Sequence, residues 1–366
     1  MPTRRLPAQP SLAHLKHQAK DLLKAHRARG LQALQRLREF HPHMRGRSDE
    51  EIAAVPLSLA DAQLAIAREY GFASWSKLKA FVDHEDARVL DLPAHERVGD
   101  AEFRRAIDLM DAGHVEALRE HLRRHPELIS RRVALPGGNY FRHPSLLEFI
   151  AENPTRNGTL PQNAADVARV LLEAGAREDR EALDSALDLA ASSRVARESG
   201  VQHELIDVLC EYGADPNGAL RSPLLYGEFD AAERLLQRGA NLTLIAAAAL
   251  GRTDDVRRLA GAASDEDRRF ALALAAQHGR AEAVRVLLQA GVNPNGFTNG
   301  GHSHATALHQ AALAGHADIA QMLLDAGARA DVRDVLFGGT PADWAKHNGH
   351  DALSNALRGP EHTLES

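Results

Sequence analysis

Apolar residues recur along this chain at helical spacing, three or four positions apart, and short polar turns separate the groups. The clearest example is residues 306–328, where the pattern predicts two short helices joined at Gly315 and closed by Gly327. Glycine reaches positive φ without a steric penalty, so it suits both turns. The side-chain oxygen of Thr306 can cap the first helix. The expected core positions of this unit are Leu308, Ala311, Ala312, Ile319, Leu323 and Leu324.

The same helix–turn–helix pattern continues on both sides of this unit. The turn glycines Gly279, Gly315 and Gly349 lie 36 and 34 residues apart. Units further upstream are shorter and less regular, and they close at Gly175, Gly213 and Gly239. We count about eight units, the first at residues 101–129. Because each unit can bury its apolar face only against a neighbour, residues 101–360 are predicted to form one stacked array.

Residues 306–328 resemble one whole ankyrin repeat. The T-x-L-H opening, the A-A-x-x-G-H middle and the L-L-x-x-G-A end all stand at that family's spacing. The resemblance implies an all-α fold, an ankyrin repeat α-solenoid of stacked helix-turn-helix units with short finger loops. It also implies a scaffold that binds a protein partner through its finger loops and concave face. In this interpretation His309 and His316 are structural histidines of the repeat.

Residues 1–83 are predicted to form a separate helical segment before the array. A long amphipathic helix starts after Ser11, and Ser48 opens a capping box. Residues 67–75, A-R-E-Y-G-F-A-S-W, resemble a helical head that precedes ankyrin arrays in bacterial proteins. We expect this head to cap the first repeat of the array. The charged residues 84–100 are the expected linker.

The composition fits this interpretation and adds a charge asymmetry. Apolar residues make up 44% of the chain and aromatic residues only 4%, so Ala and Leu carry the packing, as in helix-on-helix contacts. The net charge is −6, yet residues 1–48 hold eleven Lys or Arg and two acids. We interpret this basic stretch as a solvated helix face. The alternatives are a docking patch for an acidic partner or nucleic acid, and a contact with the acidic array.

The compartment is predicted from cysteine usage and from the apolar runs. Cys210 is the sole cysteine, which excludes an internal disulfide and favours a reducing compartment. No apolar run follows Arg4 and Arg5, so we expect no secretory signal. The longest apolar stretch, residues 242–250, is far below the roughly 20 residues of a membrane span. We expect a cytoplasmic protein with no membrane partner, and the Ala- and Arg-rich composition is typical of a bacterial source.

The sequence contains no familiar catalytic motif. It has no G-x-S-x-G, no phosphate-binding loop and no H-E-x-x-H, so we assign no catalytic residue and no cofactor, and favour a binding protein over an enzyme. His302 and His304 share one side of an extended segment near His309 and His316, and such a set could bind zinc. We interpret them instead as finger-loop surface and assign no metal. The alternative function is an array adapted as an enzyme or as a small-ligand or metal-binding protein through its concave groove.

Three long finger loops each carry an aromatic residue among polar ones, which is the composition of a binding hot spot. These loops are residues 136–143, 293–302 and 334–338. The alternative is local packing of each loop. A further insertion, residues 153–163, lengthens the turn of the second repeat and could form a flap. The predicted partner-binding residues are Asn139, Tyr140, Phe141, Arg142, His143, Phe297, Asn299, His302, His304 and Phe337.

Overall fold

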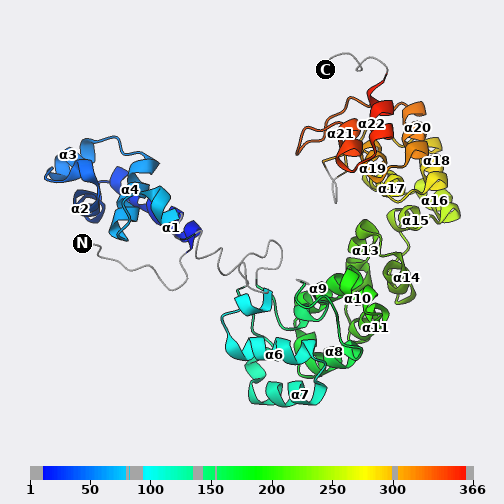
Figure 1. Ribbon diagram of the computed structural model, residues 1–366, viewed down its shortest axis with the longest axis horizontal. Helices are drawn as coiled ribbons and strands as arrows, with labels where there is room; N and C mark the ends of the chain where they lie inside the picture. The colour runs from blue at the N-terminus through cyan, green and yellow to red at the C-terminus, as the bar shows by residue number, and fades with distance from the viewer. Residues whose placement is uncertain are drawn as a thin grey trace. The chain divides into compact units, whose positions relative to one another are not determined.

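The computed structural model of this chain describes residues 11–79, 82, 94–134, 143–152, 155–298 and 304–359. All regular secondary structure in these residues is helical, which confirms the predicted all-α class. The chain divides into two compact units. The first, the head unit, comprises residues 1–98 and 135–142; the second, the array unit, comprises residues 99–134 and 143–366 (Figure 1).

The head unit is a small group of helices with a core of its own. Its helices include α1 (Leu12–Arg27), α2 (Leu31–Phe40), α3 (Asp49–Ala54) and α4 (Leu59–Glu69). Helix α4 packs against α1 and α2, and Leu15, Leu37 and Ile66 belong to one buried cluster. Ser48 begins α3 with the predicted capping box, and Ser58 begins α4 in the same way.

The array unit is a succession of helix pairs. The first elements of the pairs are α6 (Ala101–Asp111), η4 (Leu147–Phe149), α9 (Arg180–Ala191), α12 (Pro216–Ala219) with α13 (Arg221–Tyr226), α15 (Leu244–Leu250), α17 (Asp265–Gln277), α19 (Ala307–Ala314) and α21 (Pro341–His347). The second elements are α7 (Val115–Arg124), α8 (Ala164–Glu173), α11 (Gln202–Glu211) after the short α10 (Arg194–Glu198), α14 (Phe229–Gln237), α16 (Thr253–Ala260), α18 (Ala281–Gln289), α20 (Ala317–Asp325) and α22 (Asp351–Arg358).

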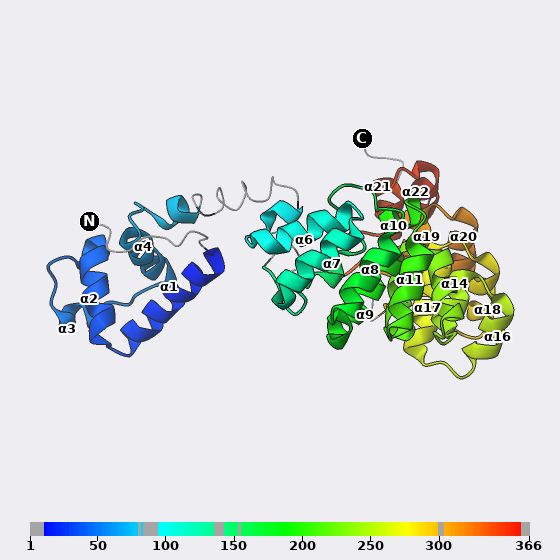
Figure 2. The ribbon, with the colours of Figure 1, turned by 90° about the horizontal axis from the view of Figure 1, so that it is seen from below.

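Corresponding helices of neighbouring pairs pack side by side. In the last four pairs α15 contacts α17, α17 contacts α19 and α19 contacts α21, while α16 contacts α18 and α18 contacts α20 (Figures 1 and 2). One buried cluster runs through these pairs from Leu244 to Leu357. Each pair therefore buries its apolar side against the next, which confirms the predicted helical solenoid.

The unit at residues 306–328 has the predicted core and turns. Gly315 and Gly327 have φ values of 77° and 89°, so both turns use the left-handed conformation that favours glycine. A Cβ atom at Gly315 would lie 2.5 Å from the His350 ring. The close packing of this turn against His350 therefore also requires a residue without a side chain. Leu324 is only partly buried. The other predicted core residues are buried: Leu308, Ala311, Ala312, Ile319 and Leu323.

The second helix pair departs from the others. Its first element is the short 3-10 turn η4, where Phe149 packs edge-on against Phe103 of α6 with ring centroids 5.9 Å apart. The described part of the insertion before α8, residues 155–163, is attached to the array through Arg156, although residues 157–159 are exposed. The Arg156 side chain in it is fully buried and donates hydrogen bonds of 2.9 and 2.6 Å to the Asp111 carboxylate. The prediction of a flap is therefore wrong for these residues.

Among the helices in the described ranges, none is both long enough and apolar enough to cross a bilayer.

Candidate partner-binding site

The finger turn, residues 334–339 between α20 and α21, is organised by one buried carboxylate. Asp334 is only 3% exposed. Its side chain accepts hydrogen bonds from the backbone N–H groups of Leu336, Phe337 and Gly339, at 3.0, 2.6 and 2.8 Å. The Trp344 indole donates a further one at 3.1 Å. A backbone hydrogen bond of 2.8 Å from Asp334 N–H to the Gly339 carbonyl closes the turn.

These hydrogen bonds keep the Asp334 carboxylate charged. Burial alone would raise the pKa of Asp334, but hydrogen bonds from Phe337, the Trp344 indole and Gly339 outweigh it and hold this pKa below its ordinary value. A charged acceptor forms stronger hydrogen bonds than a neutral one. The turn therefore has a fixed backbone conformation at neutral pH.

The fixed turn directs three consecutive apolar side chains towards solvent. Val335, Leu336 and Phe337 are 72%, 66% and 80% exposed. The other large apolar residues exposed in the described ranges, Leu31, Leu59 and Tyr226, are separate from one another in the sequence. A contiguous apolar patch of this kind is typical of a binding surface, whereas single exposed apolar residues are ordinary.

A groove lies beside this patch. The His304 ring meets Phe337 edge-on at 5.8 Å between centroids and lies 5.5 Å from the Trp344 ring. A hydrogen bond of 2.9 Å from Val335 N–H to the His304 carbonyl joins the finger turn to the backbone at His304. The groove encloses about 640 Å³ and is lined by His304, Leu313, Phe337, Gly339, Asp343, Trp344 and His347. We call these lining residues, together with Val335 and Leu336, the finger site.

His309 supports the finger site from within the core. Its ring is fully buried and packs edge-on against Trp344 at 5.2 Å. Burial lowers the pKa of His309, although the Gly339 carbonyl acts in the opposite direction, so the ring is neutral at pH 7. Nδ1 accepts a hydrogen bond from Thr306 N–H at 3.3 Å, and Nε2–H then donates to the Gly339 carbonyl at 3.2 Å. The neutral ring thus connects the start of α19 to the finger turn.

Two of the residues predicted to bind a partner, His304 and Phe337, come together in this site. Phe297 is half-buried rather than fully exposed, and His143 is exposed. The His143 backbone carbonyl accepts a hydrogen bond of 3.4 Å from the Arg132 side chain. The remaining predicted residues lie outside the described residues: Asn139, Tyr140, Phe141, Arg142, Asn299 and His302.

Sequence reasoning did not assign binding roles to Asp334, Leu336 or Trp344. One signal was available for Trp344, because the chain has only two tryptophans and this one follows the Thr340-Pro341 helix start. No comparable signal marks Asp334, since aspartate is common in turns and its role depends on groups that the fold brings to it.

Cys210 does not suggest covalent chemistry. The residue is half-buried on α11, and burial raises the pKa of its thiol to about 11. The side chain is therefore a neutral thiol at pH 7, whereas the thiolate is the nucleophilic form.

Comparisons with known proteins agree with the fold. The family model for ankyrin repeats (3 copies) matches residues 224–334, from α13 to the first residue of the finger turn. The human cyclin-dependent kinase 4 inhibitor B is 33% identical over 128 residues, which cover 27% of this chain and 89% of the relative. The corresponding protein of Bos taurus is 32% identical over 130 residues, covering 27% of this chain and 95% of the relative. The chain therefore belongs to the ankyrin repeat proteins, a family of protein-binding scaffolds.

Proposed function

We propose that this scaffold binds its protein partner at the finger site, and that the partner inserts an apolar or aromatic side chain into the groove beside Trp344. One observation carries the proposal: the apolar side chains of Val335, Leu336 and Phe337 stand exposed on a turn whose backbone is fixed by Asp334.

A fixed turn makes binding at these residues energetically favourable. A loop that is ordered before the partner arrives loses little conformational entropy on binding, so more of the contact energy appears as affinity. Large aromatic side chains beside a pocket are the residues that most often dominate interfaces. Local packing would be the alternative role for Phe337, but this residue is 80% exposed, and its ring meets His304 edge-on.

The chemistry of the groove suggests the kind of side chain that it binds. Its walls include Leu313, Phe337 and Trp344, while Asp343 and His347 provide polar groups. An apolar side chain in a segment with polar flanks fits this lining. The relatives are named as inhibitors of cyclin-dependent kinase 4 and so act on a protein. This supports a protein as the partner class here.

The other predictions from sequence extend this proposal. The remaining predicted binding residues would form further contacts along the array. A head at residues 1–83, a linker at 84–100 and an array at 101–360 remain the proposed division of the chain. We also propose a cytoplasmic location, which the single, half-buried Cys210 supports, and a bacterial source. Neither the array adapted as an enzyme nor nucleic-acid binding by residues 1–48 gains support from the relatives.

Site-specific photo-crosslinking in the source cells tests the proposal with the full-length chain. A photoreactive residue at position 337 should yield one dominant adduct with another protein. The same residue at position 226 is the matched control, because Tyr226 is also aromatic and 73% exposed, on α13 of the same unit. With the purified partner, Phe337→Ala should weaken binding at least about thirtyfold, which is typical of a hot spot. Equal adducts from both positions, or unchanged affinity of F337A, would contradict the finger site as the binding surface.

A further inference from the structure

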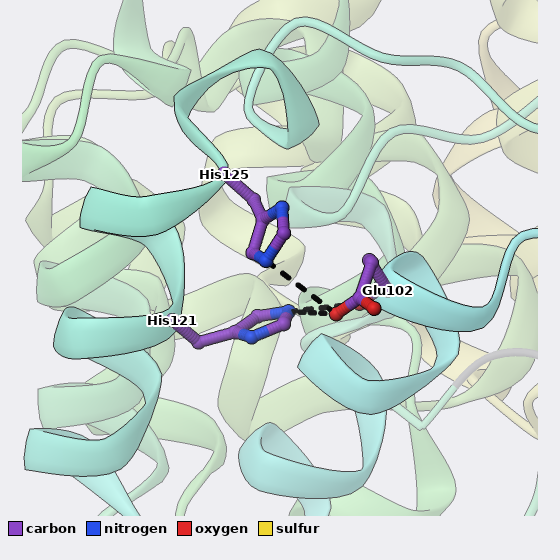
Figure 3. A group of neighbouring side chains, drawn as sticks. All are labelled: Glu102, His121 and His125. Carbon is purple, nitrogen blue, oxygen red and sulfur yellow. Dashed lines mark hydrogen bonds and ion pairs between the residues drawn. The ribbon is translucent and has the colours of Figure 1, made fainter.

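A separate cluster of potential metal ligands lies in the first helix pair of the array unit. Glu102 is in the first turn of α6, His121 is in α7 and His125 directly follows α7. Their carboxylate and imidazole donor atoms all lie within 4.8 Å of one another. Figure 3 shows both imidazole rings turned towards the Glu102 carboxylate.

The distances are close to those of a tetrahedral metal site. Oε2 of Glu102 is 3.8 Å from Nε2 of His121 and 3.6 Å from Nε2 of His125. Zinc binds nitrogen and oxygen at about 2.0–2.2 Å, so neighbouring ligands around a tetrahedral ion stand about 3.4 Å apart. The two observed distances exceed this value by only a few tenths of an ångström. The two imidazole donors lie within 4.8 Å of each other, so side-chain rotations have to bring all three ligands to coordination distance.

The local structure explains why these side chains converge. His121 lies in the last turn of α7 and His125 caps the end of this helix four residues later, with ring centroids 4.9 Å apart. The Asp100 carboxylate caps α6 by accepting hydrogen bonds from the backbone N–H groups of Glu102 and Phe103, which fixes the turn that carries Glu102.

A further carboxylate stands behind one of the imidazoles. Oε1 of Glu127 lies 3.7 Å from Nδ1 of His125, on the side of the ring opposite the shared Glu102 oxygen. This separation is longer than a hydrogen bond, and the Glu127 carboxylate would orient the His125 ring and raise its basicity only after moving to hydrogen-bond distance. Arg131 lies 3.7 Å from the same Glu127 oxygen and competes for it.

The cluster is accessible to an ion from solvent. The side chains of His121, His125 and Glu102 are 11%, 33% and 52% exposed. His121 Nε2 is also 2.9 Å from the Glu102 backbone carbonyl and donates its proton there. Coordination through Nε2 requires the other tautomer, with the proton on Nδ1, and the loss of this one hydrogen bond.

We propose that Glu102, His121 and His125 bind one Zn²⁺ ion, with a fourth position left for water. Imidazole and carboxylate ligands suit zinc, and three protein ligands with one open position form a known zinc arrangement. The ion would link the first turn of α6 to the end of α7 and so stabilise the first helix pair. This proposal does not depend on the finger site.

Titration calorimetry with zinc chloride on the metal-free, full-length chain tests the proposal. We expect the wild type to bind one equivalent of zinc. Glu102→Gln and His125→Gln should each lower the zinc affinity at least about tenfold, and Glu127→Gln should lower it less. Cobalt(II) added in place of zinc should give the visible absorption of a tetrahedral site in the wild type, and this absorption should be lost in E102Q and H125Q. Zinc should also raise the Tm of the wild type but not that of these two variants.

The control removes two other histidines. His14 and His17 are exposed on α1, and His17 lies 3.6 Å from Asp21, so a His14→Gln/His17→Gln variant reports binding to ordinary surface histidines. This variant should still bind the zinc ion whose binding E102Q and H125Q weaken. The same zinc affinity in the wild type, E102Q and H125Q would overturn the proposal. Loss of zinc binding in the His14→Gln/His17→Gln variant, with binding kept in E102Q and H125Q, would also overturn it. The partly exposed positions of Glu102 and His125 make these variants less disruptive to folding than a change at His121.

Discussion

The indole Nε1–H of Trp344 donates a hydrogen bond of 3.1 Å to the carboxylate of Asp334, ten residues earlier in the chain. The same carboxylate accepts three backbone N–H groups of the finger turn. One buried charge therefore fixes the backbone of an exposed loop and also attaches that loop to α21, the helix behind it. The apolar patch at Val335, Leu336 and Phe337 depends on this arrangement for its ordered presentation.

Asp334→Ala should destabilise the last helix pair and loosen the finger turn. Removing the carboxylate leaves four donors without their acceptor, and we expect a loss of about 2 to 3 kcal/mol in the free energy of unfolding. Thermal unfolding measures the loss, while hydrogen exchange at residues 335–339 and Trp344 fluorescence report the turn itself.

The matched control for this change is Asp331→Ala, in the same loop. Asp331 is exposed, and its carboxylate accepts hydrogen bonds of 3.0 and 2.7 Å from the exposed Arg329 side chain. An exposed ion pair contributes little to stability, so D331A should leave the Tm unchanged. If both alanine variants lowered the Tm equally, the conclusion that the Asp334 carboxylate specifically stabilises the finger turn would be wrong.

The sequence was sufficient to predict the repeat architecture but not the finger site. The core of residues 306–328 follows from helical spacing and turn glycines, because both are local properties of the chain. Phe297 and Phe337 look equivalent in sequence, since each is one aromatic residue in a polar finger loop. They differ in the structure because the Asp334 hydrogen bonds turn Phe337 outward, whereas Phe297 is half-buried.

The zinc-binding cluster illustrates the same limit. The spacing of His121 and His125 is visible in the sequence, but Glu102 comes from another helix, and only the packing of α6 against α7 brings it near them. The sequence instead drew attention to His302 and His304, whose closeness in the chain made them a candidate pair. Spacing along one helix can be predicted from sequence, whereas convergence between helices requires the fold.

Gly315→Ala should cost more stability than Gly327→Ala. Both glycines have positive φ, at 77° and 89°, so each alanine should cost about 1 kcal/mol in backbone strain. A Cβ at Gly315 would also lie 2.5 Å from the His350 ring, whereas Gly327 has no atom within 4 Å of the new carbon. Thermal unfolding of the two variants measures the difference. Adding His350→Ala to G315A should recover part of the loss; no recovery would show that the ring is not the cause.

Asp207 should make the array sensitive to acid in a defined pH range. Burial opposes ionisation, but hydrogen bonds from Arg234 and Arg238, each 2.7 Å from Nε to Oδ1, outweigh it and lower the pKa of Asp207 from 3.8 to about 2. The folded chain therefore holds the proton less tightly than the unfolded chain. The stabilisation is complete above the ordinary pKa and is lost as the pH falls from 3.8 towards 2.

The variant Asp207→Asn tests this pH dependence. Its Tm should be lower than that of the wild type near neutral pH, and the difference should shrink between about pH 5 and about pH 2. Asp254→Asn is the control, because the Asp254 side chain is 99% exposed. A difference between wild type and D207N that stays constant across this range would show that the carboxylate does not titrate as its contacts imply.

Arg156→Met should strongly destabilise the first two helix pairs. The Arg156 side chain is fully buried, and the Asp111 carboxylate that it contacts is 11% exposed. Arg156 also donates a hydrogen bond of 3.0 Å to the Phe149 carbonyl, and its guanidinium lies 5.3 Å from the centre of the Phe149 ring. Methionine restores much of the volume but leaves Asp111 without its cation, and breaking a buried pair in this way costs about 3 to 5 kcal/mol.

A matched control distinguishes this loss from a general effect of removing an arginine. Arg194→Met removes a side chain that is 70% exposed and pairs with Glu198 within one helix, so its Tm should match that of the wild type. If R156M were as stable as R194M, the buried Arg156 contacts would contribute nothing to stability. Residues 155–163 would then behave as a dispensable surface segment, like the flap predicted from sequence. A partly restored Tm in the double variant Arg156→Met/Asp111→Leu, relative to R156M, would instead identify the unpaired Asp111 carboxylate as one source of the loss, because this variant removes that charge. Glu152, whose fully buried side chain lies 4.0 Å from Arg156, keeps its charge in this variant.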